Sequence, residues 1–185
     1  MNIKKIITII LIMVSVLTGC GKSDSDKVKD NSQVTQENHG RVEEETVETL
    51  VAKFNTEVVD NSSLNPASTD YLTESNNEYW YGLIEGIYLV AVPKKYTGDK
   101  AADIVNYTLL YVNKTGEYES DAASYVKHLI KANNNQITDS EIDTLLKEAK
   151  TKPNSGEAAN NGKGISVGYT ENEEKYQYQV LRLYK

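Results

Sequence analysis

The chain has 185 residues and a mass of 20.6 kDa, a length that corresponds to one domain with short additional segments. Its 20 basic residues are outnumbered by 27 acidic ones. The resulting net charge of −7 disfavours a nucleic-acid-binding protein, which needs a basic surface to neutralise phosphates. The single cysteine excludes an internal disulfide and a zinc site built from cysteines.

The first 20 residues have the pattern of a secretory signal. Lys4 and Lys5 form a positive segment, and an uncharged, largely apolar run follows at residues 6–16. This run is too short to cross a bilayer as a helix, which takes about 20 residues. It ends in the sequence LTGC, in which the cysteine is Cys20. The whole segment resembles the lipobox signal of bacterial lipoproteins.

The resemblance implies that residues 1–19 are a signal peptide and that Cys20, the first mature residue, carries a diacylglyceryl group of the palmitate type. Two acyl chains hold a protein stably on a membrane, whereas one chain binds only marginally. We therefore expect a lipid anchor on the extracytoplasmic side of the cell membrane. Abundant asparagine and lysine with only three prolines suggest an AT-rich genome, and we expect a Gram-positive source.

A polar tract separates this anchor from the rest of the chain. Residues 21–40 contain two valines as their only apolar residues and show no periodicity, so they cannot bury enough surface to offset their ordering entropy. We expect residues 20–40 to form the lipidated cysteine and a flexible tether. Residues 41–185 then form a single globular domain, long enough to build a core without disulfides.

In the first half of this domain, apolar residues at helical spacing predict a helix over residues 42–59, with Glu43, Glu44 and Glu45 at its start. Residues 61–77 are polar and read as a loop. Residues 78–92 are rich in tyrosine, isoleucine and valine and predict two strands joined at Glu85-Gly86. A third strand is expected over residues 103–112.

The second half begins with a helix whose apolar positions run from Ala122 to Ile130. A second helix follows, for which Thr138 and Glu141 have the spacing of a capping box. Residues 154–164 read as a loop, and two strands finish the chain at residues 165–170 and 175–184. The order α-βββ-αα-ββ predicts an α+β fold, with an antiparallel sheet of about five strands and helices packed on one face.

Several motifs invite a catalytic interpretation, but none forms a complete set. Ser166 lies in the pattern G-x-S-x-G, yet the chain downstream lacks the histidine that a nucleophile elbow requires. The glycine-rich stretch at residues 156–164 departs from the phosphate-binding loop in spacing and leads into a strand. His128 has no ligand cluster around it in the sequence. We expect no catalytic residues, no metal and no cofactor.

The unusual feature is the aromatic composition, because thirteen tyrosines accompany one phenylalanine and one tryptophan. Tyrosine suits a half-buried sheet face, where the ring packs and the hydroxyl stays hydrated. Tyrosine and tryptophan are also favoured at binding surfaces. The pattern thus fits either simple packing or a binding face, for which the candidates are Tyr79, Trp80, Tyr81, Tyr88, Tyr107 and Tyr111.

These observations lead to a hypothesis about function. We expect a membrane-anchored, extracytoplasmic lipoprotein that acts as a non-catalytic binding module for a protein, a peptide or the cell wall. The alternative is a cell-envelope hydrolase that uses a carboxylate or serine site whose members the sequence does not reveal.

Overall fold

The computed structural model describes residues 42–68, 73–75, 77–114, 118–160 and 162–183. The signal peptide, Cys20 and the tether therefore lie outside the described residues. In chain order the elements are α1 (Val47–Asn61), β1 (Thr73–Ser75), β2 (Glu78–Ile84), β3 (Ile87–Pro93), β4 (Val105–Asn113), a 3₁₀ turn (Glu119–Asp121), α2 (Ala122–Asn133), α3 (Asp139–Thr151), β5 (Ala159–Asn160), β6 (Ile165–Glu171) and β7 (Lys175–Arg182).

The strands form one sheet in the order β1-β2-β3-β4-β7-β6-β5, and all neighbours are antiparallel. The predicted α+β class is confirmed, and the five predicted strands correspond to β2, β3, β4, β6 and β7. The expected number of about five strands was too low, because β1 and β5 add one short strand at each edge of the described sheet. At three and two residues they are too short to show an alternating pattern.

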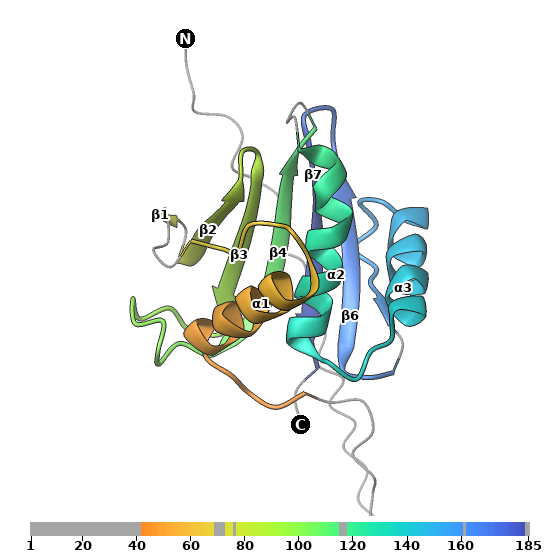
Figure 1. The fold of residues 1–185 in the computed structure, drawn as a ribbon. Coiled ribbons are helices and arrows are strands. Elements are labelled where there is room, and N and C mark those ends of the chain that lie inside the picture. Colours follow the sequence, from red (N-terminus) through yellow and green to blue (C-terminus); the bar gives the residue numbers. More distant parts are fainter. Residues whose placement is uncertain (1–41, 69–72, 76, 115–117, 161, 184–185) are drawn as a thin grey trace, which may run out of the picture. The chain divides into compact units, whose positions relative to one another are not determined.

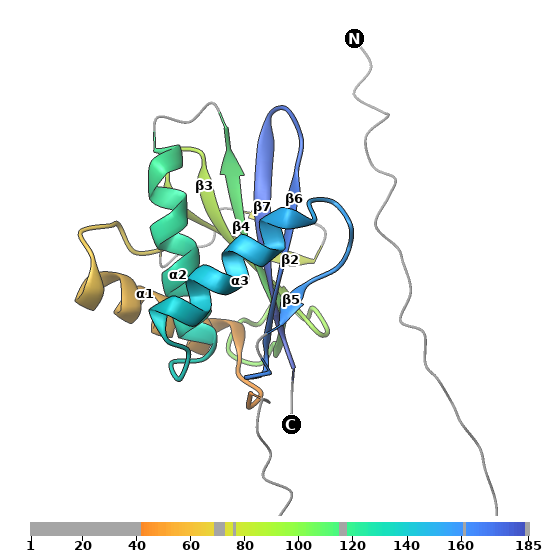
Figure 2. The ribbon, with the colours of Figure 1, turned by 90° about the vertical axis from the view of Figure 1, so that its right-hand side faces the viewer.

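The three α-helices lie on the same face of the sheet, as predicted (Figures 1 and 2). α2 packs against β4 and β7, α3 packs against β5 and β6, and α1 packs against α2. The opposite face carries none of the described helices. We call this second surface the open face.

The core fills the space between the helices and the sheet. Phe54 of α1, Leu129 of α2 and Ile142 of α3 are fully buried there, together with sheet residues such as Leu89 and Leu110. Every residue of this core lies between positions 42 and 180. Residues 36–185, which contain this core, form one compact unit of the chain, so we expect the domain to fold as a fragment.

Helix α1 begins five residues later than the sequence predicts. Thr46 is its N-cap and accepts a hydrogen bond from the Thr49 amide. The preceding residues are extended and pair with strand ends, since the Val42 amide donates to the Leu183 carbonyl at 2.8 Å. The acidic run that includes Glu45 therefore precedes the helix instead of forming its first turn, because backbone pairing holds this segment in an extended form.

At the edge of the sheet beyond β6, Asn154 forms hydrogen bonds with β6 in addition to the pairing of β5. The Asn154 amide nitrogen donates to the Tyr169 carbonyl at 3.1 Å, and the Asn154 side chain exchanges two hydrogen bonds with the backbone of Glu171, of 2.9 and 3.0 Å. Asn154 has a φ of 60°, a left-handed conformation that asparagine tolerates better than most residues. It occupies edge positions at which another chain would otherwise pair.

Candidate functional site

The six aromatic residues singled out in the sequence fall on two different faces of the sheet. Tyr79 and Tyr81 point toward the helices and are 0% and 1% exposed. They belong to the core and cannot present their rings to a partner. The other four, Trp80, Tyr88, Tyr107 and Tyr111, lie on the open face and are partly exposed.

The register of the strands explains this division. Successive side chains of a strand point to opposite faces, so Tyr79 and Trp80 must separate. Trp80 pairs with Val90, which pairs with Leu109, and this row crosses three strands on the open face. In the next row Tyr88 pairs with Tyr111, which pairs with Gln177 of β7.

Three of the open-face rings form a cluster. The centroid of Trp80 lies 5.6 Å from that of Tyr111 and 6.0 Å from that of Tyr88, and the two tyrosines are 6.2 Å apart. The planes are inclined by 59° to 66°, an arrangement that favours edge-to-face contact. We call Trp80, Tyr88 and Tyr111 the aromatic cluster. Beneath it, Val90 is fully buried.

Two charged side chains border the aromatic cluster. The indole nitrogen of Trp80 donates a hydrogen bond to Glu78 Oε2 at 3.0 Å, and burial raises the pKa of the Glu78 carboxyl above its usual value of 4.5. On the other side, the Lys175 ammonium nitrogen lies 4.9 Å from the centroid of the Tyr111 ring. Tyr111 thus already accepts a cation on the negative face of its ring.

The amide and hydroxyl side chains of the open face come mainly from the last two long strands. Gln177 and Gln179 extend from β7 beside Tyr111 and Leu109, and Thr170 lies next to Gln177 on β6. The open face has a depression at Gly168, because this residue has no side chain opposite Gln179. The open face therefore combines rings on β2, β3 and β4 with hydrogen-bonding groups on β7 and β6.

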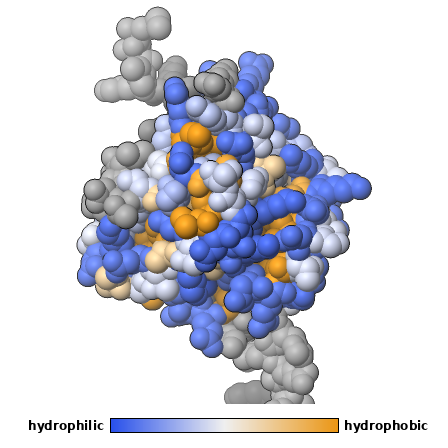
Figure 3. Space-filling view, viewed as in Figure 1, coloured by the Kyte–Doolittle hydropathy of each residue, from blue (hydrophilic) through white to orange (hydrophobic). Residues whose placement is uncertain are grey.

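The helix side of the molecule has a different character. Hydrophilic residues cover most of that surface, and the apolar ones form small separate patches (Figure 3). Among the described residues, the large apolar side chains with the highest exposure are Val59 on α1, at 61%, and Leu183. The open-face rings differ from these two in that they contact one another.

A cavity of about 870 Å³ lies between α1 and the end of α2. In it Arg182 Nη1 donates to Glu45 Oε1 at 2.7 Å and to Asn133 Oδ1 at 2.8 Å. Lys53 contacts the other oxygen of Glu45. Since Glu45 binds both cations and Arg182 also donates to the Glu43 carbonyl, this polar group joins residues 43–45 to the end of β7. We interpret it as structural.

The residues considered for a hydrolase do not come together. Ser166 pairs with Leu181, and the strand alternation places its side chain on the open-face side of β6, where it is buried. His128 lies on the helix side, with its Nδ1 atom 4.0 Å from Glu57 Oε2. Burial lowers the pKa of His128, although Glu57 acts to raise it. The sheet separates Ser166 from His128, so they cannot act as a nucleophile and its base.

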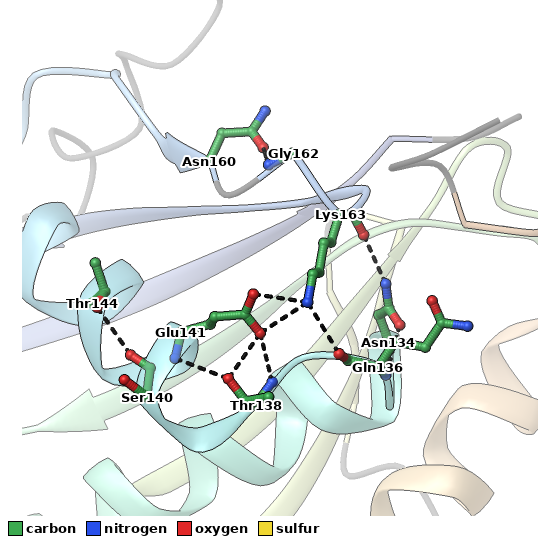
Figure 4. A network of polar contacts seen from close by, with 9 residues as sticks. All are labelled: Asn134, Gln136, Thr138, Ser140, Glu141, Thr144, Asn160, Gly162 and Lys163. Atoms are coloured by element: carbon green, nitrogen blue, oxygen red, sulfur yellow. Dashed lines mark hydrogen bonds and ion pairs between the residues drawn. The ribbon is translucent and has the colours of Figure 1, made fainter. Parts of the chain in front are cut away.

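The glycine-rich stretch before β6 also has a structural role. Thr138 and Glu141 form the predicted capping box at the start of α3. The Lys163 ammonium group binds Glu141 Oε1 at 2.7 Å, and Asn134 Nδ2 donates to the Lys163 carbonyl at 2.7 Å (Figure 4). Lys163 therefore holds the glycine-rich stretch against the turn between α2 and α3. Lys163 is the first cause of the low pKa of Glu141, about 2.

In the part of the chain that the structure describes, no three histidine, cysteine, aspartate or glutamate side chains gather as metal ligands would. No described helix is long and apolar enough to cross a membrane.

Sequence reasoning did not single out Glu78, Lys175, Gln177 or Gln179. Strand alternation alone places Glu78 on the same face as Trp80, two residues later in β2. The positions of Lys175, Gln177 and Gln179 instead follow from the pairing of β4 with β7, strands that are more than 60 residues apart in the chain. Local patterns carry no information about such a pairing. The alternation of Gln177 and Gln179 with Tyr176 and Tyr178 was the available signal.

We found no match to this chain among family models, curated proteins or solved structures. The geometry of its surface is therefore the basis for the functional argument.

Proposed function

We propose that this chain is a non-catalytic binding protein, anchored through a lipid on Cys20 to the extracytoplasmic side of the membrane, and that the open face is its recognition surface. The observation that carries the proposal is the aromatic cluster of Trp80, Tyr88 and Tyr111 on a sheet face that none of the described helices covers. Partly exposed aromatic side chains in mutual contact are typical of binding surfaces.

The rigidity of the support favours this role. The aromatic cluster stands on three adjacent strands that are paired along their length, over a buried valine. The rings therefore lose little further conformational freedom when a partner binds. A low ordering cost lets a modest contact area yield useful affinity.

The lipid anchor and tether supply the other part of the proposal. A tether of 20 residues has a root-mean-square span of about 25 Å, enough to let the domain turn its open face toward envelope components near the membrane. The serine form of the hydrolase alternative finds no support, since Ser166 and His128 lie on opposite sides of the sheet.

The test uses the fragment 36–185, which contains the whole core, and isolated cell envelopes of the encoding bacterium. We expect the fragment to co-sediment with envelopes in a saturable manner. The double variant Tyr88→Ala/Tyr111→Ala should lose this binding, because it removes two of the three rings. Val59→Ala, an exposed apolar residue on the helix side, is the matched control and should bind normally.

Thermal unfolding followed by circular dichroism would establish that all three proteins are folded at the assay temperature. Equal sedimentation of the double variant and the control, or no sedimentation of any protein, would contradict the proposal.

A further inference from the structure

We propose that the open face binds an uncharged glycan chain that lies across β2, β3, β4 and β7. This inference rests on the proposed binding function and specifies its partner. It follows from the charge, the chemistry and the dimensions of the open face.

The open face carries few charged side chains. The registers of the five long strands place seventeen described side chains or glycines on the open face: Glu78, Trp80, Gly82, Tyr88, Val90, Val92, Tyr107, Leu109, Tyr111, Asn113, Ser166, Gly168, Thr170, Lys175, Gln177, Gln179 and Leu181. Only Glu78 and Lys175 are charged, whereas a quarter of all residues in the chain are. A neutral surface on an acidic protein complements a neutral partner, because a charged one would lose its hydration without gaining an opposite charge.

The second argument is the combination of aromatic rings and amides. A sugar ring has an apolar face of C–H bonds and an edge of hydroxyl groups. The C–H face packs on the negative face of an aromatic ring, and the rings of the aromatic cluster are partly exposed. The hydroxyl groups need donors and acceptors at the same level, and Gln177 and Gln179 supply both kinds from the adjoining strand.

The third argument is the extent of the surface. The distance from β2 to β7 spans three strand spacings, or about 14 Å. A single sugar would leave either the rings or the amides without a contact. Several linked sugars can cover the aromatic cluster and reach Gln179 together. A single small molecule would instead favour an enclosed pocket.

The arrangement of the sheet edges argues against an extended peptide as the partner. Such peptides bind by adding a strand to a free edge. The edge beyond β6 is already occupied by β5 and by Asn154, and at the other edge β1 pairs with β2 and the Ser68 amide donates to the Gly82 carbonyl at 3.1 Å. A second copy of this chain is the remaining competitor for the open face, and the test below separates it from a glycan.

The test uses Trp80 as the reporter, since it is the only tryptophan of the chain. The fragment 36–185 is titrated with two neutral probes, the β-1,4-linked hexamers of N-acetylglucosamine and of glucose. We expect at least one hexamer to change the Trp80 emission in a saturable manner. Tyr111→Ala should weaken that binding about tenfold, the factor that corresponds to the loss of one aromatic contact. Val59→Ala is the control and should bind as the unmodified fragment does.

Lys175→Ala provides a second, opposite expectation. Removing this side chain uncovers the face of Tyr111, so a neutral hexamer should bind at least as tightly as before. Weaker binding of the hexamer by Lys175→Ala would show that the Lys175 ammonium group, and not the face of Tyr111, makes the contact, and this result would overturn the proposed packing of a sugar on the aromatic cluster.

Two further outcomes would also overturn it. If neither hexamer changes the emission but envelope binding still requires Tyr88 and Tyr111, the proposed function stands and the glycan is wrong. If the fragment instead forms a dimer in sedimentation equilibrium and Tyr111→Ala makes it monomeric, the open face is covered by a second copy. If the Tyr88→Ala/Tyr111→Ala variant still bound to envelopes, the proposed function would be wrong as well.

Discussion

At the scale of single residues, neighbours in the sequence have different roles. Tyr79 faces the core and donates a hydrogen bond from its hydroxyl to Asp103 Oδ2 at 2.7 Å. Trp80 lies on the opposite face and donates to Glu78. Because side chains alternate between the two faces of a strand, a structural residue and a candidate recognition residue are neighbours in the sequence.

We predict that Tyr79→Phe destabilises the domain and that Tyr111→Phe does not. Asp103 is buried, and hydrogen bonds from Thr97 and Tyr79 hold its pKa below 3.8, although burial acts to raise it. Losing the Tyr79 donor should lower the free energy of unfolding by about 2 kcal/mol, a typical value for a hydrogen bond to a charged group. Urea unfolding would measure it. Equal stability of the two variants would show that the Tyr79 hydroxyl is not needed.

A second prediction concerns the titration of Glu78. Because burial raises its pKa, the Trp80 emission should change with pH at a midpoint above 4.5, the usual value for glutamate. A raised pKa in the folded state favours the protonated form, so this carboxyl stabilises the domain at low pH and loses that contribution as the pH rises through the folded pKa. Glu78→Gln should therefore be at least as stable at pH 7.

The emission of Glu78→Gln should also lack the titration. A midpoint at or below 4.5 in the unmodified fragment, or the same transition in the variant, would contradict the assignment.

At the scale of elements, features set by residues close together in the chain could be predicted, whereas features set by distant residues could not. The capping box of Thr138 and Glu141 could be predicted because both partners lie within one helical turn. The long strands were predicted from their own composition. The start of α1 was not, because the Val42 amide pairs with Leu183 near the other end of the chain. Lys175, Gln177 and Gln179 were missed for the same reason, because β7 pairs with a strand far away in the chain.

We predict that Thr138→Ala lowers the free energy of unfolding by about 1 kcal/mol, since it removes the N-cap acceptor of α3. Thr144→Ala, inside the same helix, is the matched control and should be neutral, because alanine favours helix interiors. Chemical denaturation of both variants would test this. A loss in Thr144→Ala as large as that in Thr138→Ala would contradict it.

At the scale of the whole molecule, the account joins an anchor, a tether and a domain with one open sheet face. The anchor follows from the resemblance of residues 1–20 to lipoprotein signals. The recognition surface follows from the sheet registers that place Trp80, Tyr88, Tyr107 and Tyr111 on the same face.

We predict that Cys20→Ser abolishes lipidation and releases the protein from stable membrane attachment, because no other cysteine can accept the diacylglyceryl group. Metabolic labelling with a palmitate analogue and fractionation of the cells would measure both effects. Undiminished labelling of the Cys20→Ser protein would refute the anchor.

The central claim is that the open face becomes covered when the protein meets its envelope partner. Acrylamide quenching of Trp80 emission measures this directly, since the chain has no other tryptophan and Trp80 belongs to the aromatic cluster. The account predicts that Trp80 in the fragment 36–185 is quenched readily in solution and much less after the fragment has bound to isolated envelopes. Unchanged quenching of the bound fragment would show that the open face stays exposed and would contradict the claim.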